Sequence, residues 1–150
     1  PISRLAPCVA DGVFEEQAVF VKDLVEAGGR AGVGSHGQLQ GLGYHWELWA
    51  MAAGGISEHD ILKVATIQGA DGIGLDDDLG SIEEGKLADL VILNSNPLDN
   101  IRNTSDISHI MKNGYLYEAE TLDEVFPNQK ELPTFWWQNT GPMDVPGVDR

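Results

Sequence analysis

The sequence has little sulfur and little positive charge. Its 150 residues contain a single cysteine, Cys8, so no disulfide can form within the chain. Lysine and arginine together number 9 against 24 aspartate and glutamate residues, which gives a formal net charge of -15. So acidic a chain is repelled by phosphate groups, which argues against nucleic acid and membrane surfaces as partners.

The sequence also lacks any apolar run long enough to span a bilayer. It shows no signal peptide, and it begins at Pro1 rather than at a methionine. We therefore expect the start of the natural gene product to be missing, and the cellular compartment stays undetermined.

The first half of the chain alternates helical and strand-like patterns. Residues 13–27 predict an amphipathic helix, because apolar residues recur at helical spacing and a glycine pair follows. The short apolar run 30–35 then predicts a buried parallel strand. A helix over 44–53 comes next, and a capping pattern at Ser57 opens a further helix whose apolar face extends to Gln68. Helix, turn and strand in this order are typical of an α/β fold.

The second half of the chain is rich in strand-forming residues. Residues 88–93 form an apolar run typical of a strand. The runs 107–111 and 115–118 flank an Asn113-Gly114 pair, which is a strong hairpin signal. Beyond residue 120 four prolines break any long element. The pattern thus changes from helix–strand units to hairpin strands.

Three motifs follow one another in a fixed order: Gly34-Ser35-His36, the Ala-Thr-x-x-x-Ala run over 65–70, and the Gly-rich segment 80–91 with its Gly-Lys-x-Ala-Asp-Leu-Val core. Together they resemble the closing part of a metal-dependent amidohydrolase of the imidazolonepropionase- or dipeptidase-like kind. The resemblance extends over residues 13–126. Further matches to the closing strands of that family lie at 96–98 and 111–114.

The resemblance implies the C-terminal fragment of a (β/α)8 barrel followed by strands of a small β-sandwich domain. It assigns 1–79 to the last βα units of the barrel, 80–126 to the closing sandwich strands and 127–150 to an irregular tail. It also implies a parent enzyme that hydrolyses carbon–nitrogen bonds in an amide, a cyclic amide or a dipeptide-like small molecule. One or two divalent ions, commonly zinc, would be bound mostly by residues that this chain lacks, such as the family's His-x-His pair.

The Gly-rich segment itself has a structural logic. Gly80 and Gly85 permit tight turns at either end of a short stretch. Lys86 is expected to face solvent or to cap backbone groups, although a functional role stays open. Asp89 is expected to accept backbone hydrogen bonds at the start of the strand.

His36 stands where members of the resembled family usually place an aspartate. Residues at the carboxyl ends of barrel strands face the active site, so His36 is the candidate catalytic residue and the candidate metal ligand. Its imidazole could coordinate the metal, or act as a general base without touching it. A third interpretation is that this subgroup has lost or relocated the usual chemistry.

Gln38 and His45 are candidates for contacts with the substrate. Gln38 lies in the glycine-punctuated loop, and His45 lies near the start of the following helix. Glu47 either orients one of the histidines or lies in the first helical turn and complements the helix dipole. Residues two apart on a helix do not share a face, so His45 and Glu47 cannot easily bind one metal.

On this interpretation we expect the isolated chain to be inactive. Its partner would be the missing barrel portion, or other copies of itself, because a cut barrel exposes unpaired sheet edges. An alternative hypothesis is a non-catalytic binding or structural module that retains the amidohydrolase tail. An upstream His-x-His pair would favour the enzyme, and a clean monomer at high concentration would argue against self-association.

Overall fold

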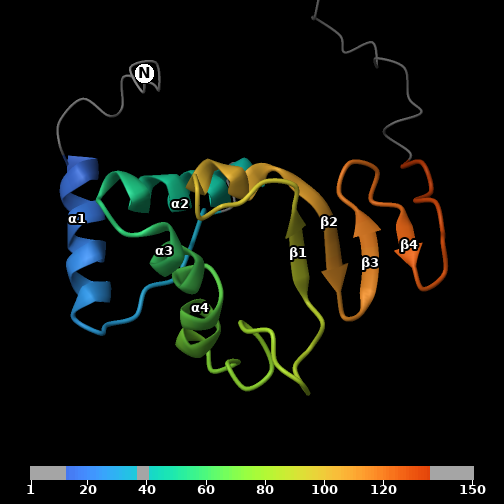
Figure 1. The fold of residues 1–150 in the computed structure, drawn as a ribbon, viewed down its shortest axis with the longest axis horizontal. Helices are drawn as coiled ribbons and strands as arrows, with labels where there is room; N and C mark the ends of the chain where they lie inside the picture. Colours follow the sequence, from blue (N-terminus) through green and yellow to red (C-terminus); the bar gives the residue numbers. More distant parts are fainter. Residues whose placement is uncertain (1–12, 37–40, 136–150) are drawn as a thin grey trace, which may run out of the picture.

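The helices of the protein gather on one side and a four-stranded sheet extends from the other (Figure 1). The structure is a computed structural model, and it describes residues 13–36 and 41–135. The elements in chain order are α1 (Val13–Glu26), α2 (Leu42–Ala53), α3 (Glu58–Val64), α4 (Ile67–Gly72), β1 (Leu90–Leu93), the 3-10 helix η2 (Ile101–Ser105), β2 (Ile107–Lys112), β3 (Tyr115–Glu118) and β4 (Glu124–Phe126). Among these helices, none has the length and apolar character needed to cross a membrane.

The predicted helix beyond Ser57 forms, but it is divided into α3 and α4. The hydroxyl of Ser57 accepts a hydrogen bond from the backbone N–H of Asp60 at 3.2 Å, which confirms the N-cap. The break falls at Thr66, whose backbone leaves helical geometry at φ -129° and ψ -97°. Its hydroxyl donates to the carbonyl of Leu62 at 2.6 Å, and such a local bond competes with helix continuation.

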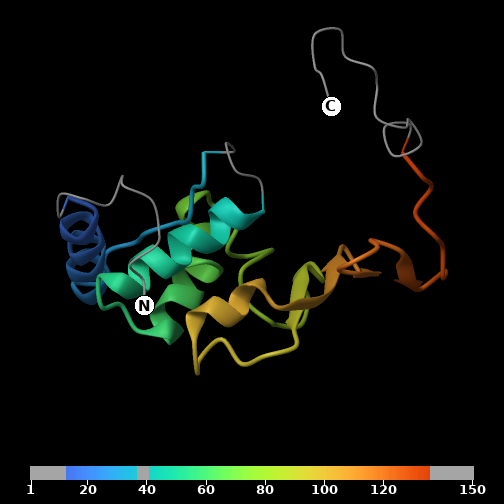
Figure 2. The ribbon, with the colours of Figure 1, turned by 90° about the horizontal axis from the view of Figure 1, so that it is seen from above.

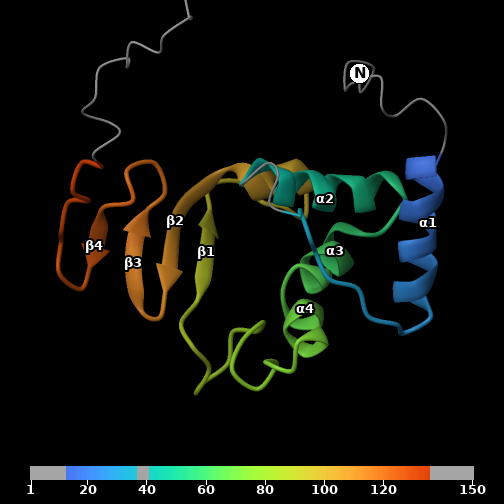
Figure 3. The same cartoon turned by 180° about the vertical axis from the view of Figure 1, so that it is seen from behind.

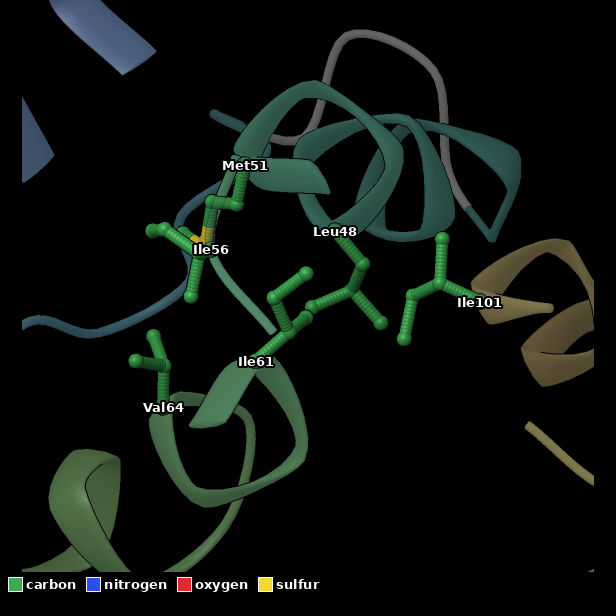
Figure 4. Close-up of a cluster of buried hydrophobic side chains, with 6 residues drawn as sticks. All are labelled: Leu48, Met51, Ile56, Ile61, Val64 and Ile101. Carbon is green, nitrogen blue, oxygen red and sulfur yellow. The ribbon is translucent and has the colours of Figure 1, made fainter. Parts of the chain in front are cut away.

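The hydrophobic core lies between the helices and η2. Side chains of Leu48, Ile61 and Ile101 point toward one another in Figure 4. The buried cluster consists of Leu48, Met51, Ile56, Ile61, Val64 and Ile101. Because Ile101 comes from the segment after β1, this core joins the second half of the chain to the first.

The sheet has the order β1-β2-β3-β4 and every neighbouring pair is antiparallel. The predicted hairpin is confirmed, since Lys112 pairs with Tyr115 across Asn113 and Gly114. These two turn residues have φ of 50° and 82°, as a two-residue hairpin turn with the right twist requires. The sequence did not predict β4, because its three residues are too few to show a period.

Both faces of the sheet carry exposed apolar side chains. Val91 and Ile92 are adjacent in β1, so they point to opposite faces, yet they are 60% and 42% exposed. Phe126 in β4 is 57% exposed. Outside the sheet, Ile82 in the loop before β1 is 89% exposed. Figure 2 shows the sheet nearly edge-on, with no described helix over β3 or β4. The described part of the chain therefore leaves the sheet uncovered.

The predicted parallel strand over 30–35 is not a strand in the described structure. The segment runs from the end of α1 past α3 toward the start of α2 (Figure 3). It makes no backbone–backbone hydrogen bond with other described residues. The N–H of Ala31 instead donates to the side chain of Gln68 at 3.4 Å, and Arg30 forms an ion pair with Asp71. The physical reason is that a strand requires a paired neighbouring strand, and no described strand pairs with this segment.

Candidate active-site segment

The segment that leads to His36 has two different sides. Ala31 and Val33 are half-buried and pack against the helical core. The alternating glycines, Gly32 and Gly34, are exposed, and so is His36. The exposed positions 32, 34 and 36 thus alternate with half-buried ones, and they define the glycine side of the segment. A Cβ on Gly32 would still lie 3.9 Å from Gly69 of α4, so this side is not clear of the helices.

The backbone of His36 is in the left-handed region, with φ of 57°. A non-glycine residue rarely adopts this conformation, and such residues cluster where the chain must hold a side chain in a set direction. The extended run thus ends at the histidine, where the chain turns out of the direction of 30–35. His36 ends the run, but the run is not a strand, so the predicted place of His36 at a barrel strand end stays a prediction.

His45 lies in the first turn of α2 and contacts η2. Its Nδ1 is 3.1 Å from the hydroxyl oxygen of Thr104. Thr104 is 6% exposed, and its hydroxyl also donates to the carbonyl of Ile101 at 2.8 Å. Burial lowers the pKa of His45, because removal from water disfavours the imidazolium form. The imidazole is thus favoured as a neutral hydrogen-bonding group.

Aromatic side chains surround His45. The Tyr44 ring meets it edge-on with centroids 5.9 Å apart, and the Trp49 ring centroid lies at 6.4 Å. The guanidinium of Arg102 lies 4.8 Å from the Trp49 ring centroid, a cation–π contact. Tyr44 donates its hydroxyl to the carbonyl of Ala65 at 3.1 Å, and burial raises the pKa of this phenol. These contacts hold the first turns of α2 against α3 and η2.

The remaining predicted residues are not brought into this group. Gln38 lies outside the described residues. Glu47 is exposed, and α2 begins at Leu42 with no acidic residue in its first turn. The expected role of Glu47 at the helix dipole is therefore wrong, because the helix begins two residues before the predicted start at Tyr44. Glu47 has no hydrogen bond to either histidine in the described structure.

The described residues do not make up a metal site by themselves. Across 13–36 and 41–135, no group of three or more His, Cys, Asp or Glu side chains lies close enough together to hold an ion. Catalytic zinc sites typically have three protein ligands. An open hollow does occur at the far end of the sheet, beside Thr121 and Leu132, but neither His36 nor His45 lines it.

Sequence reasoning missed Thr104, Trp49 and Arg102. Thr104 is 59 residues from His45 in the chain, and no spacing rule connects them. The i, i+4 spacing of His45 and Trp49 could have placed the tryptophan on the histidine's side of α2. The contacts of Arg102 and Thr104 depend on how η2 packs on α2.

Comparison with known proteins identifies the family. The sequence profile of the amidohydrolase family matches residues 4–116, so the chain belongs to this family. The chain is 44% identical over 62 residues to a 5-methylthioadenosine/S-adenosylhomocysteine deaminase of Teredinibacter turnerae, a match that includes 41% of this chain and 14% of the deaminase. The chain thus spans about a seventh of that relative.

Solved structures agree with this assignment. A Xaa-Pro dipeptidase with bound methionine superimposes with a TM-score of 0.61 and 30% identity, covering 68% of this chain and 25% of the dipeptidase. An amidohydrolase from Thermotoga maritima gives a TM-score of 0.56 and 27% identity, covering 73% of this chain and 26% of that protein. These neighbours imply a TIM-barrel family, in agreement with the predicted α/β class. The β-sandwich stays a prediction.

Proposed function

We propose that this chain is the C-terminal portion of a metal-dependent hydrolase that acts on carbon–nitrogen bonds. Family membership supports the hydrolase class. The relatives named as a deaminase and as a dipeptidase indicate amide, cyclic amide or dipeptide-like small molecules as the substrate class. In this proposal residues 1–79 supply the last βα units of the barrel, and residues 80–126 supply closing strands of a side domain.

The observation that carries the proposal is the unpaired extended segment 30–35. One side of it packs on helices, its backbone makes no backbone–backbone hydrogen bond with other described residues, and His36 stands at its carboxyl end. Buried backbone groups are almost always paired in complete folds. We infer that neighbouring barrel strands from outside this chain pair with this segment and bury its glycine side.

The uncovered sheet supports the same proposal. Exposed apolar residues on both faces, such as Val91 and Ile92, are expected of a sheet that another layer covers in the complete protein. At about 25 cal/mol per Å² of apolar area, covering even a few hundred Å² would contribute several kcal/mol. This gain would favour association with the missing portion of the protein, against the entropy cost of association, and self-association is the alternative when that portion is absent.

The proposal includes a metal because members of the amidohydrolase family are generally metal-dependent. The described residues do not form a complete ligand set. One or two divalent ions, with zinc as the first candidate, would be held mostly by side chains outside this chain. His36 is the ligand that this chain would add, at the position where the family usually has an aspartate.

The isolated chain provides the first test. We expect no hydrolysis of Xaa-Pro dipeptides or cyclic amides, and no deamination of adenosine derivatives, with Zn²⁺ supplied in stoichiometric amount. Measurable turnover by the purified chain would contradict the proposal that most of the active site lies elsewhere.

A longer polypeptide that contains this sequence provides the second test. There, His36→Ala should lower kcat/KM about 100-fold, as expected for loss of a catalytic acid–base group, or should remove bound metal. His59→Ala is the matched control, because His59 is exposed on α3 and should leave both quantities unchanged. A longer polypeptide with neither metal nor activity would favour the non-catalytic module instead.

A further inference from the structure

The direction of the hydrogen bonds at Thr104 determines the protonation of His45. A threonine hydroxyl has one proton to donate and lone pairs to accept. In η2 this proton is directed to the carbonyl of Ile101 at 2.8 Å, which is a normal bond for a buried hydroxyl. The oxygen can therefore serve the imidazole at 3.1 Å only as an acceptor. With the hydroxyl proton assigned to Ile101 in this way, Nδ1 of His45 would be the nitrogen that carries the ring proton.

The second ring nitrogen of His45 is then a free acceptor. In a neutral imidazole with hydrogen on Nδ1, Nε2 holds a lone pair. Nε2 makes no hydrogen bond within the described residues, and it is not among their buried unpaired polar atoms. The ring is held from two sides, by Tyr44 and by Trp49, so its direction is restricted. A neutral, oriented acceptor is thus available at the beginning of α2.

The position of His45 in the fold would place its Nε2 at the proposed substrate-binding end of the barrel. The first turn of α2 follows the loop after His36, and in a βα unit this is the end of the barrel where substrates bind. Substrates with a carbon–nitrogen bond commonly carry an N–H or amine group close to the bond that breaks. An acceptor at this position is therefore complementary to such a donor.

We propose that Thr104 is a positioning residue, which fixes His45 as the Nδ1–H tautomer so that Nε2 accepts a hydrogen bond from an N–H or O–H group of the substrate. The substrate contact rests on the proposed function. The tautomer depends only on this chain, so the two can be tested separately.

The tautomer is tested by NMR on the ¹⁵N-labelled chain at about pH 8, where a histidine is neutral. Two-bond proton–nitrogen correlations of the ring distinguish the protonated nitrogen from the bare one. We expect Nδ1–H in the unchanged protein and in Thr104→Ser, which keeps the hydroxyl. In Thr104→Val the Nδ1–H form loses its acceptor, and the ratio of the two tautomers should shift about fivefold toward Nε2–H.

The matched control is Ser105→Ala. The Ser105 hydroxyl donates to the carbonyl of Arg102 at 3.0 Å, the same kind of bond in the same 3-10 helix, but it does not touch the histidine. This variant should leave the tautomer of His45 unchanged. An Nε2–H ring in the unchanged protein, or an equal shift in Ser105→Ala and Thr104→Val, would overturn the positioning role.

The substrate contact is tested in the longer polypeptide. We expect Thr104→Val to raise KM by about fivefold, with a smaller change in kcat, and Thr104→Ser to restore KM. An unchanged KM together with the expected NMR result would overturn the substrate contact alone. A longer polypeptide without activity would instead overturn the proposed function, and the NMR result would still decide the role of Thr104.

Discussion

The buried ammonium of Lys86 provides the sharpest test of how the Gly-rich segment is held. The Lys86 side chain is only 12% exposed. Its Nζ donates to the carbonyl of Asp76 at 2.5 Å and to the hydroxyl of Ser81 at 2.6 Å, and it lies 3.5 Å from the carbonyl of Leu79. The lysine therefore joins both ends of the loop before β1, which confirms a capping role and excludes a solvent-facing one.

Lys86→Met keeps the apolar stem and removes the charged donor. Hydrogen bonds to charged groups contribute about 1.5–3 kcal/mol each, so two short bonds imply a loss of about 3–6 kcal/mol in the stability of this loop. The ion pair with Glu83 adds little, because that carboxylate is 62% exposed. A loss of about 3–6 kcal/mol corresponds to an increase of about 150-fold or more in the open population of the loop.

Native-state hydrogen exchange measures this opening directly. The amide of Leu87 donates to the carbonyl of Asp78 at 3.0 Å, so it reports on closure of the loop. Its protection should fall about 150-fold or more in Lys86→Met. Lys63→Met is the control, since Lys63 makes an ion pair with Asp60 in which both side chains are more than 40% exposed. Equal protection of Leu87 in the two variants would refute the reasoning.

Two further predictions concern the same region. Gly80→Ala should destabilise the chain by about 1–3 kcal/mol more than Gly85→Ala, measured by urea unfolding: both glycines have positive φ, but only at Gly80 would a new Cβ lie 2.8 Å from atoms of α4. Two hydrogen bonds lower the pKa of Asp89: the one from the Lys112 side chain has the larger effect, and the one from the backbone N–H of Asn113 has the smaller. The stabilisation from Asp89 is therefore complete above about pH 4 and is lost as pH falls through the lowered pKa, so the destabilisation caused by Asp89→Asn should shrink at about pH 3. A pH-independent difference between Asp89→Asn and the unchanged protein would contradict this.

The candidate site could be predicted only in part from the sequence. A local pattern placed His36 at the end of a buried strand, but the described structure forms no strand there, and the role of His36 stays a prediction. The partner of His45 was not predictable, because Thr104 is 59 residues away and reaches it through the packing of η2 on α2. The sequence also predicted the start of α2 two residues too late, at Tyr44 instead of Leu42. Glu47 therefore lies beyond the first turn, and helix boundaries are the least certain part of any such prediction.

The sequence by itself determined the features that depend on neighbouring residues. The Asn113-Gly114 hairpin, the N-cap at Ser57 and the amphipathic α1 all follow from local conformational preference and periodicity. Tertiary structure decided the features in which distant segments meet: the addition of β4 to the sheet, the burial of Lys86 and the contact of Thr104 with His45. It also left 30–35 unpaired, because a strand is defined by hydrogen bonds to a neighbour, and no pattern within the strand can supply that neighbour.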